Sequence, residues 1–187
     1  AVMSRLAELG PLPSLVVFDL DYTLWPLWID THVSGPPFHP VEGGKAAKAR
    51  CGGLVKLFRD VPEILLELHV RDDVEIGLAS RTGEPRWATS VAKLLRLQDG
   101  PTLFDVATYQ EIYPSTKTKH FAELRRKSGK EFADMLFFDD ESRNIREVGG
   151  MGVHCELVDE SEGVSWRAFT KGVAAWQEKR GTSREAP

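Results

Sequence analysis

The chain has 187 residues, of which 42% are hydrophobic and 28% charged, and its formal net charge is −4. These values are typical of a globular protein that buries one core without a metal or disulfide. The acidic balance argues against nucleic acid as a bulk electrostatic partner, since such binding needs a basic face.

Residues 1–187 are expected to form one domain, with a core at about 14–180 and a flexible tail at 181–187. The two cysteines, Cys51 and Cys155, lie far apart, which indicates free thiols in a reducing compartment. No run of 18 apolar residues occurs, so we expect no membrane partner. We therefore expect a cytoplasmic protein, with a nuclear one also compatible, and a monomer.

Short apolar runs rich in β-branched and aromatic residues alternate with helical patterns along the chain. This alternation is typical of an α/β fold, a Rossmann-like three-layer sandwich with a central parallel sheet. The five expected strands cover residues 15–20, 74–80, 103–109, 135–140 and 153–158.

Helix starts are marked by Pro62, by Pro85, and by Ser115 or Thr116, because proline is tolerated in a first turn and hydroxyls cap helices. A last helix is expected at about 165–179. The glycine- and proline-rich segment 26–55 is too irregular for a further packed layer. It predicts a minimal cap, a flap or hairpin over the sheet edge.

Polar residues follow the expected strands where those strands end. Asp19 and Asp21 end the first strand, Ser80 the second, and Asp139 and Asp140 the fourth. Ligands of open parallel sheets bind beyond the carboxyl ends of the strands. If the first and fourth strands are neighbours, at least three carboxylates converge and need a compensating cation. An all-oxygen set favours Mg²⁺, which would also attract phosphate.

Each of these features has a plainer alternative. Asp139 and Asp140 could simply lie at a helix N-terminus, where acids suit the dipole, and Ser80 could cap a helix. Asp19 and Asp21 fit that alternative poorly, because the following "TLWPLW" is not helical.

Lys117 occupies the first turn of an expected helix, where the dipole disfavours a cation. An anionic partner would compensate, although a solvated lysine remains the alternative. The five histidines show no pairing at metal-ligand spacing and are expected to be surface or core polar residues.

Read in order, a D-x-D-x-T strand end, a serine, a lysine and a D-D pair resemble the haloacid dehalogenase-like (HAD) hydrolase superfamily. Within residues 19–144, the wording "FDLDYTLWP", "ASRT", "EIYPSTKTKHF" and "FFDDESRNI" is similar to the eukaryotic magnesium-dependent phosphatase family, whose small members have a minimal cap. The resemblance implies a Mg²⁺-dependent phosphomonoester hydrolase.

By this resemblance Asp19 is the nucleophile that forms an aspartyl phosphate, and Asp21 is the general acid and then the base. Leu20, Ser80 and Lys117 would bind the phosphoryl group. The implied substrates are phosphotyrosine-like aryl esters and sugar phosphates, on a small molecule or a protein side chain.

The resemblance also implies a Mg²⁺ site made of Asp19, the backbone carbonyl of Asp21, and the pair Asp139 and Asp140. Asp140 aligns with the direct ligand, and Asp139 would stand behind it. Where the superfamily often has a further acid, this chain has Asn144, for which we expect a water-mediated or orienting role.

The rim of the site is less defined by the sequence. Arg81 could contact substrate or phosphate, or be a surface arginine. Trp25 and Trp28 are expected to build the wall and flap of the entrance, with a core role equally plausible for one of them. The segment 26–55 is expected to set substrate selectivity.

Three other functions fit parts of this pattern. A dehalogenase has no leaving alkoxide to protonate, so Asp21 favours phosphate esters. A receiver domain has its acidic pair after strand one but its phosphorylated Asp after strand three, where this chain reads "VATYQEIYP". A catalytically idle module that binds a phosphorylated partner would need a lost motif, and all the motif residues are present.

Overall fold

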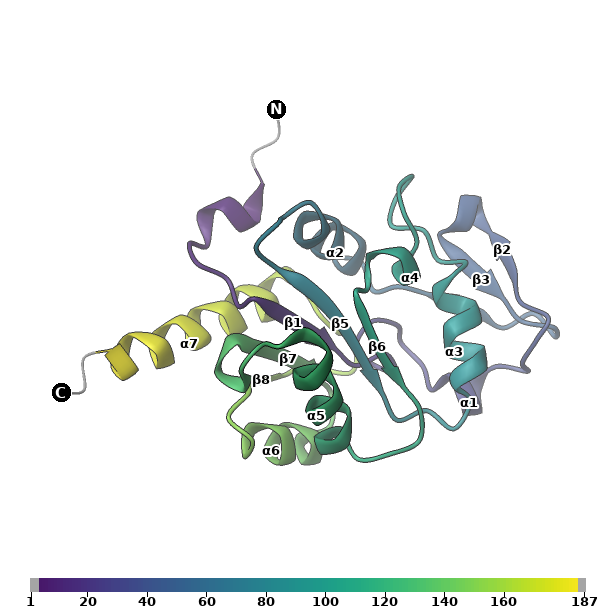
Figure 1. Cartoon of the computed structure of the whole chain (residues 1–187). Helices are drawn as coiled ribbons and strands as arrows, with labels where there is room; N and C mark the ends of the chain where they lie inside the picture. Colours follow the sequence, from purple (N-terminus) through teal and green to yellow (C-terminus); the bar gives the residue numbers. More distant parts are fainter. Residues whose placement is uncertain (1–3, 185–187) are drawn as a thin grey trace.

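The structure, a computed structural model, describes residues 4–184 and is built around a five-stranded sheet (Figure 1). The strand order is β6-β5-β1-β7-β8, and every neighbouring pair is parallel. The strands are β1 Leu15–Phe18, β5 Glu75–Ser80, β6 Tyr109–Ile112, β7 Met135–Asp139 and β8 His154–Leu157.

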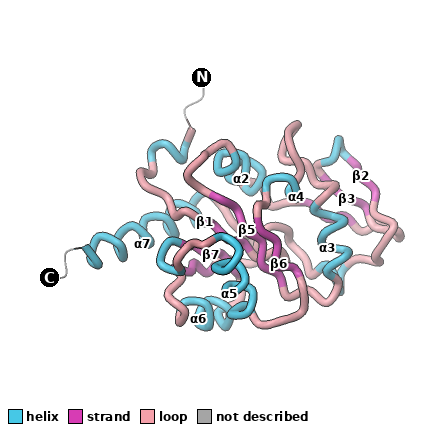
Figure 2. The backbone as a smooth tube through the Cα atoms, in the orientation of Figure 1, coloured by secondary structure: helices cyan, strands magenta, loops and turns pink. Residues whose placement is uncertain are grey.

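Helices cover both faces of this sheet, which gives the expected three layers (Figure 2). Alternation along β1 divides the core, because Val16 and Phe18 pack on one face and Leu15 and Val17 on the other. The first face meets α2 Val61–His69, α3 Pro85–Ala92 and α7 Trp166–Arg184; the second meets α5 Lys117–Ser128 and α6 Ser142–Gly149. The remaining short helices are η1 Arg5–Glu8, α1 Ile29–His32, η2 Glu42–Gly44, α4 Leu103–Val106 and η3 Phe132–Asp134.

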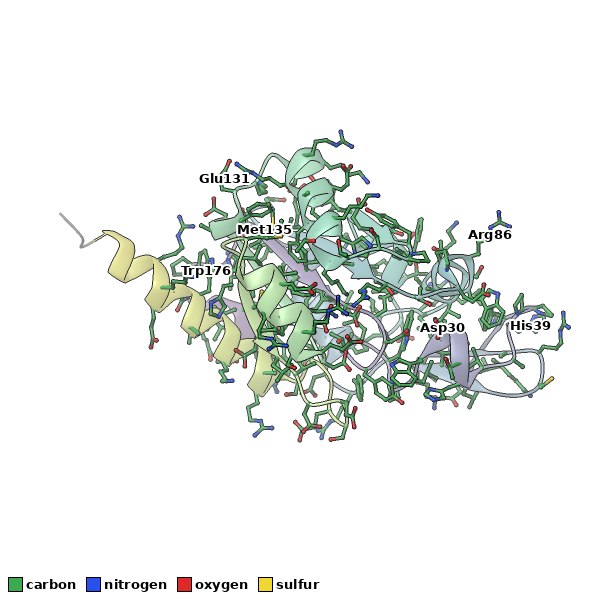
Figure 3. All side chains as sticks on the ribbon, turned by 90° about the horizontal axis from the view of Figure 1, so that it is seen from below. Asp30, His39, Arg86, Glu131, Met135 and Trp176 are labelled. Carbon is green, nitrogen blue, oxygen red and sulfur yellow. The ribbon has the colours of Figure 1, made fainter. Side chains whose placement is uncertain are left out.

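The segment expected to be a flap forms a second, antiparallel sheet at one end of the molecule, the end that carries Asp30 and His39 in Figure 3. Its strands are β2 His39–Val41, β3 Ala46–Lys48 and β4 Leu54–Lys56, in that order. The register partners Ala47 and Val55 are fully buried in the larger core. The minimal cap is therefore a packed three-stranded sheet rather than a bare hairpin.

The strand expected at 103–109 is wrong, because this stretch starts as a helix. Thr102 and Asp105 form a capping box in which the Thr102 Oγ1 accepts from the Asp105 amide (3.2 Å) and the Asp105 carboxylate accepts from the Thr102 amide (2.9 Å). The box starts α4, and β6, the third strand of the parallel sheet along the chain, begins only at Tyr109.

The expected helix starts are confirmed. Pro62 is the second residue of α2, Pro85 is the first of α3, and the Thr116 side chain caps α5 by accepting from the Lys119 amide (3.3 Å). Trp166, Phe169, Val173 and Trp176 of the last helix are buried, as predicted.

The last helix runs further than expected, to Arg184, so residues 181–184 of the predicted flexible tail are helical. Residues 185–187 lie outside the described part of the chain. Within residues 4–184, the structure contains no helix that is both long and apolar enough to span a bilayer.

Candidate active site

Three strand ends bring the predicted site residues together. The order β5-β1-β7 places Ser80, Asp19 and Asp139 at one edge of the parallel sheet. The Asp19 amide donates to the Phe138 carbonyl (3.0 Å), which ties the end of β1 to β7. The expected adjacency of the first and fourth predicted strands is thus confirmed.

A tight turn follows β1 and fixes the second aspartate. The amides of residues 23–25 all donate to the carbonyl of Leu20. Within this turn the Asp21 Oδ1 accepts from the Trp25 indole (2.6 Å) and from the Ile29 amide (3.2 Å). Trp25 is completely buried, so it is the core member of the tryptophan pair.

Lys117 reaches the site from the first turn of α5 and is only 1% exposed. Its Nζ lies 2.5 Å from the Asp19 Oδ1 and 3.1 Å from the Asp139 Oδ2, and it also donates to the Ala79 carbonyl. These carboxylates are the expected anionic partner, which compensates for the unfavourable position of a cation in the first turn of a helix. Lys119, two residues later, is exposed.

A hydrogen-bonded chain holds Asp139 from behind. The Asn144 side-chain amide donates to both Asp139 carboxylate oxygens (3.1 and 3.0 Å). Arg81 in turn donates to the Asn144 Oδ1 (3.3 Å) and to the Ser115 carbonyl (3.1 Å). Asn144 thus orients Asp139 in this structure, and Arg81 is bonded to Asn144.

Three carboxylates form a cluster that fits a divalent cation. One oxygen each of Asp19, Asp139 and Asp140 lies within 4.8 Å of the others. The Lys117 ammonium balances one of these three charges, which leaves two, the charge of one Mg²⁺. An all-oxygen donor set is also what Mg²⁺ prefers.

The pKa values of these groups also indicate that the ionised carboxylates are unfavourable without a further cation. Burial raises the pKa of Asp19 well above its usual range, with Lys117 opposing the change. Burial and the Asp139 charge raise the pKa of Asp140 to about 7. Burial also raises the pKa of Asp21 to about 6. For Lys117, burial acts to lower the pKa, but the two carboxylates outweigh it and the pKa is raised.

These residues line a cavity of about 380 Å³. It brings together most of the predicted site residues, whereas Asp139 is fully buried behind it and Leu20 is buried in the turn. Its lining residues are Asp19, Asp21, Trp28, Asp30, Ser80, Arg81, Thr82, Lys117, Asp140, Glu141, Arg143 and Asn144.

Asp30 and Arg143 line the cavity although no sequence motif points to them. The Asp30 Oδ2 accepts from the Gly83 amide (3.0 Å), which joins α1 to the loop after β5. Asp30 is exposed and lies outside any recognisable motif, so only the path of the chain after β1 brings it here.

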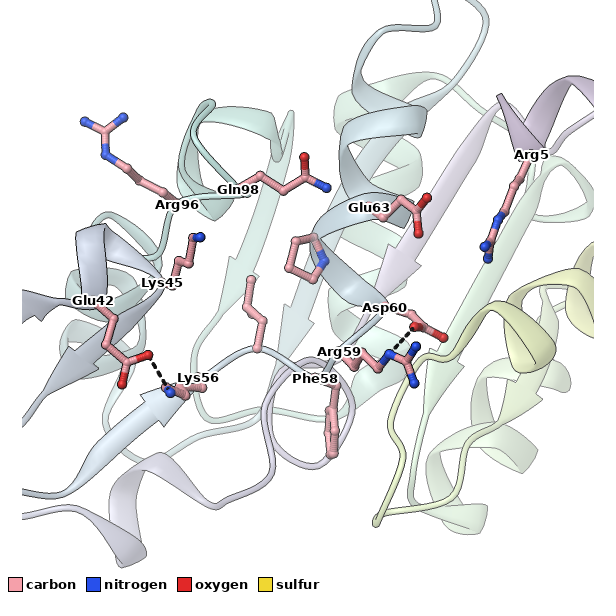
Figure 4. Close-up of a pocket in the computed structure, with 12 residues that line it drawn as sticks. Arg5, Glu42, Lys45, Lys56, Phe58, Arg59, Asp60, Glu63, Arg96 and Gln98 are labelled. Carbon is pink, nitrogen blue, oxygen red and sulfur yellow. Dashed lines mark ion pairs between the residues drawn. The ribbon is translucent and has the colours of Figure 1, made fainter. Parts of the chain in front are cut away.

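A second, larger hollow of about 640 Å³ lies beside the small sheet and the start of α2 (Figure 4). It contains none of the clustered carboxylates, and its own acids have partners within the protein. Glu42 pairs with Lys56 (2.5 Å), and Glu63 accepts from the Trp166 indole (2.8 Å). Among the described residues, the three clustered acids therefore lie in or directly behind the smaller cavity.

The fold is that of HAD-like hydrolases. Across 91% of this chain and 43% of the other, the structure resembles the magnesium-complexed N-terminal part of a Bacteroides fragilis protein containing a phosphatase domain, with a TM-score of 0.58 and 17% identity. Because the sequence identity is low, this resemblance shows a shared fold and nothing further.

Residues 11–179 match the acid phosphatase family, and the chain belongs to it. It is 44% identical over 162 residues to human magnesium-dependent phosphatase 1, covering 87% of this chain and 86% of that protein. It is 41% identical to a HAD-like hydrolase superfamily protein of Schizosaccharomyces pombe, covering 75% and 83%. The protein is a HAD-superfamily, Mg²⁺-dependent phosphatase.

The raised carboxyl pKa values predict how Mg²⁺ stabilises the protein. An acid whose pKa is higher in the folded state favours folding most below its unfolded value near 4, and this contribution is lost as pH rises through about 6 to 7. The metal-free protein should therefore lose stability over that range. Mg²⁺ binds the ionised carboxylates, so it should restore stability above pH 7 and contribute little below about 5.

Thermal unfolding of metal-stripped protein, with and without excess Mg²⁺ across this pH range, checks the prediction. The gain in Tm on adding Mg²⁺ should grow as pH rises. A gain that is the same at both ends of the range would contradict a site made of these carboxylates.

Proposed function

We propose that the protein hydrolyses phosphate monoesters through an aspartyl phosphate on Asp19, and that its substrates are phosphotyrosine-like aryl esters or sugar phosphates. One observation carries the proposal: the buried Asp19 carboxylate contacts Lys117 and shares a cavity with Asp21, a second carboxyl group with a pKa of about 6. These two groups would supply a nucleophile and a proton donor where a phosphoryl group would bind.

In the first step an Asp19 oxygen attacks phosphorus, and the bond between phosphorus and the leaving oxygen breaks. The electron pair of that bond goes to the leaving oxygen, which takes a proton from Asp21. Lys117 favours the ionised form of Asp19, and together with Ser80 it would bind the phosphoryl oxygens.

In the second step water attacks the phosphorus of the aspartyl phosphate, and Asp21 accepts the water proton. The bond between phosphorus and the Asp19 oxygen then breaks and the carboxylate is regenerated. A carboxyl group with a pKa of about 6 suits both duties, because it donates and accepts protons near neutral pH.

Bound Mg²⁺ would neutralise charge on the phosphoryl group. We propose that Asp19, the Asp21 carbonyl and Asp140 hold it. Asp140 lines the cavity, whereas Asp139 is fully buried and already accepts from Asn144 and from the Glu141 amide (2.8 Å). Asp139 would therefore act through its neighbours, with Arg81 acting through Asn144.

The first test is phosphate release from para-nitrophenyl phosphate, with Mg²⁺ and with EDTA. Release that requires Mg²⁺ supports the proposed reaction on an aryl ester. No release from this or any sugar phosphate, under conditions where the protein binds inorganic phosphate, would favour a phosphate-binding module instead.

Replacing Asp21 should slow the reaction in a way that depends on the leaving group. We expect Asp21→Asn to lower kcat by about 10²- to 10⁴-fold, the usual contribution of general acid–base catalysis, and more for an alkyl phosphate than for para-nitrophenyl phosphate. The alkoxide needs the proton more, because nitrophenolate is already a stable leaving group.

Asp99→Asn is the control, since Asp99 is an exposed aspartate outside the cavity. It should leave both rates unchanged. Equal losses on both esters for Asp21→Asn would argue against proton donation to the leaving oxygen, and unchanged turnover would eliminate the acid and base assignment.

A further inference from the structure

We propose that the indole ring of Trp28 is the platform on which the leaving group stacks, and that it selects phosphate esters with a flat aromatic leaving group, as in phosphotyrosine. The inference rests on the proposed function. We expected the segment 26–55 to set substrate selectivity, and the inference assigns that role to one side chain of the segment.

Trp28 is the apolar exception in the cavity. It is 49% exposed, and each of the other residues that line the cavity is polar or charged. Three further large hydrophobic residues are exposed in the described part of the chain, but Leu54, Val70 and Leu157 lie outside this cavity. An exposed indole in a polar site offers a surface for an aromatic ring.

The indole is also held in place. Its ring stacks on His32, with centroids 5.4 Å apart and 6° between the planes, and it is nearly perpendicular to the Tyr22 ring, with centroids 5.6 Å apart and 88° between the planes. The Trp28 amide donates to the His32 Nδ1 (2.9 Å). Tyr22 has a φ of 56°, a left-handed conformation uncommon for a non-glycine residue. A ring fixed in this way loses little entropy when it binds a ligand.

Trp28 lies on the side of the cavity where the leaving group is expected. The residue after Trp28 donates its amide to Asp21, the proposed proton donor to the leaving oxygen. The phosphoryl group is expected at the other side, next to Lys117, which contacts Asp19 and Asp139. A ring attached to the oxygen beside Asp21 would therefore extend toward Trp28.

The test compares phenyl phosphate with propyl phosphate, using kcat/KM for each. Trp28→Ala should lower the phenyl-to-propyl ratio about tenfold, the scale of one aromatic stacking contact. Trp28→Phe keeps a flat ring and should retain most of the ratio. Leu54→Ala, a large exposed residue of the small sheet, is the matched control and should leave the ratio unchanged.

Binding of phenylphosphonate and propylphosphonate, measured by calorimetry in Mg²⁺, separates this inference from the proposed reaction, since neither compound is hydrolysed. Trp28→Ala should remove the preference for phenylphosphonate. An unchanged preference and an unchanged rate ratio would overturn the platform. Wild-type protein that binds phenylphosphonate preferentially but releases no phosphate would overturn the proposed function alone.

Discussion

Asp19→Asn should abolish phosphate release, by about 10⁴-fold or more, which is the order of loss when a covalent nucleophile is removed. An amide oxygen does not attack phosphorus as a carboxylate does. The fold should survive, because asparagine has nearly the same shape and Lys117 keeps its contacts with Asp139 and the Ala79 carbonyl. Initial rates on para-nitrophenyl phosphate in saturating Mg²⁺ measure the effect.

Asp72→Asn provides the control, because Asp72 is exposed in the turn before β5. This variant should match the wild type in rate and in thermal unfolding. If the folded Asp19→Asn protein kept more than about a tenth of wild-type activity, attack by Asp19 would be wrong.

Lys117→Met should reduce both stability and activity. The side chain is 1% exposed and lies between two carboxylates, so its removal leaves buried negative charge without a partner. Breaking such a pair costs about 3–5 kcal/mol in the free energy of unfolding. Loss of the cation that we propose binds the phosphoryl oxygens should lower kcat by a further factor of about 10²–10³. Urea unfolding in EDTA and initial rates in Mg²⁺ measure the two effects separately.

Lys119→Met is the matched control, because Lys119 lies on the same helix and is exposed. Mg²⁺ should recover part of the stability of Lys117→Met by binding the same carboxylates. A free energy of unfolding within about 1 kcal/mol of the Lys119→Met value in EDTA would show that Lys117 is not the balancing charge.

The sequence could predict the sheet and the centre of the site because their signals are local. Strands β1, β5 and β7 lie in short, largely apolar runs, and Asp19, Ser80 and Asp139 stand where those runs end. The topology of parallel sheets then brings the ends together. The buried contacts of Lys117 agree with a cation that is unfavourable at the start of a helix.

Other features have a competing local signal or depend on contacts between distant segments. The 103–109 run is largely apolar and predicts a strand, but the capping box at Thr102 stabilises the start of a helix instead. The small antiparallel sheet is made of strands of three residues, held partly by burial in the larger core. The bond from Arg81 to Asn144 joins residues 63 positions apart, so no local pattern could show it.

The most direct measurement is the mass of the peptide that contains Asp19 after acid quenching of the Asp21→Asn variant during turnover of para-nitrophenyl phosphate with Mg²⁺. Acid preserves an acyl phosphate, and loss of the proposed base should let the intermediate accumulate. We expect one phosphoryl group on Asp19, absent when Asp19→Asn is added. Phosphate release with Asp19 unmodified, or a phosphoryl group on another residue, would contradict the aspartyl-phosphate mechanism.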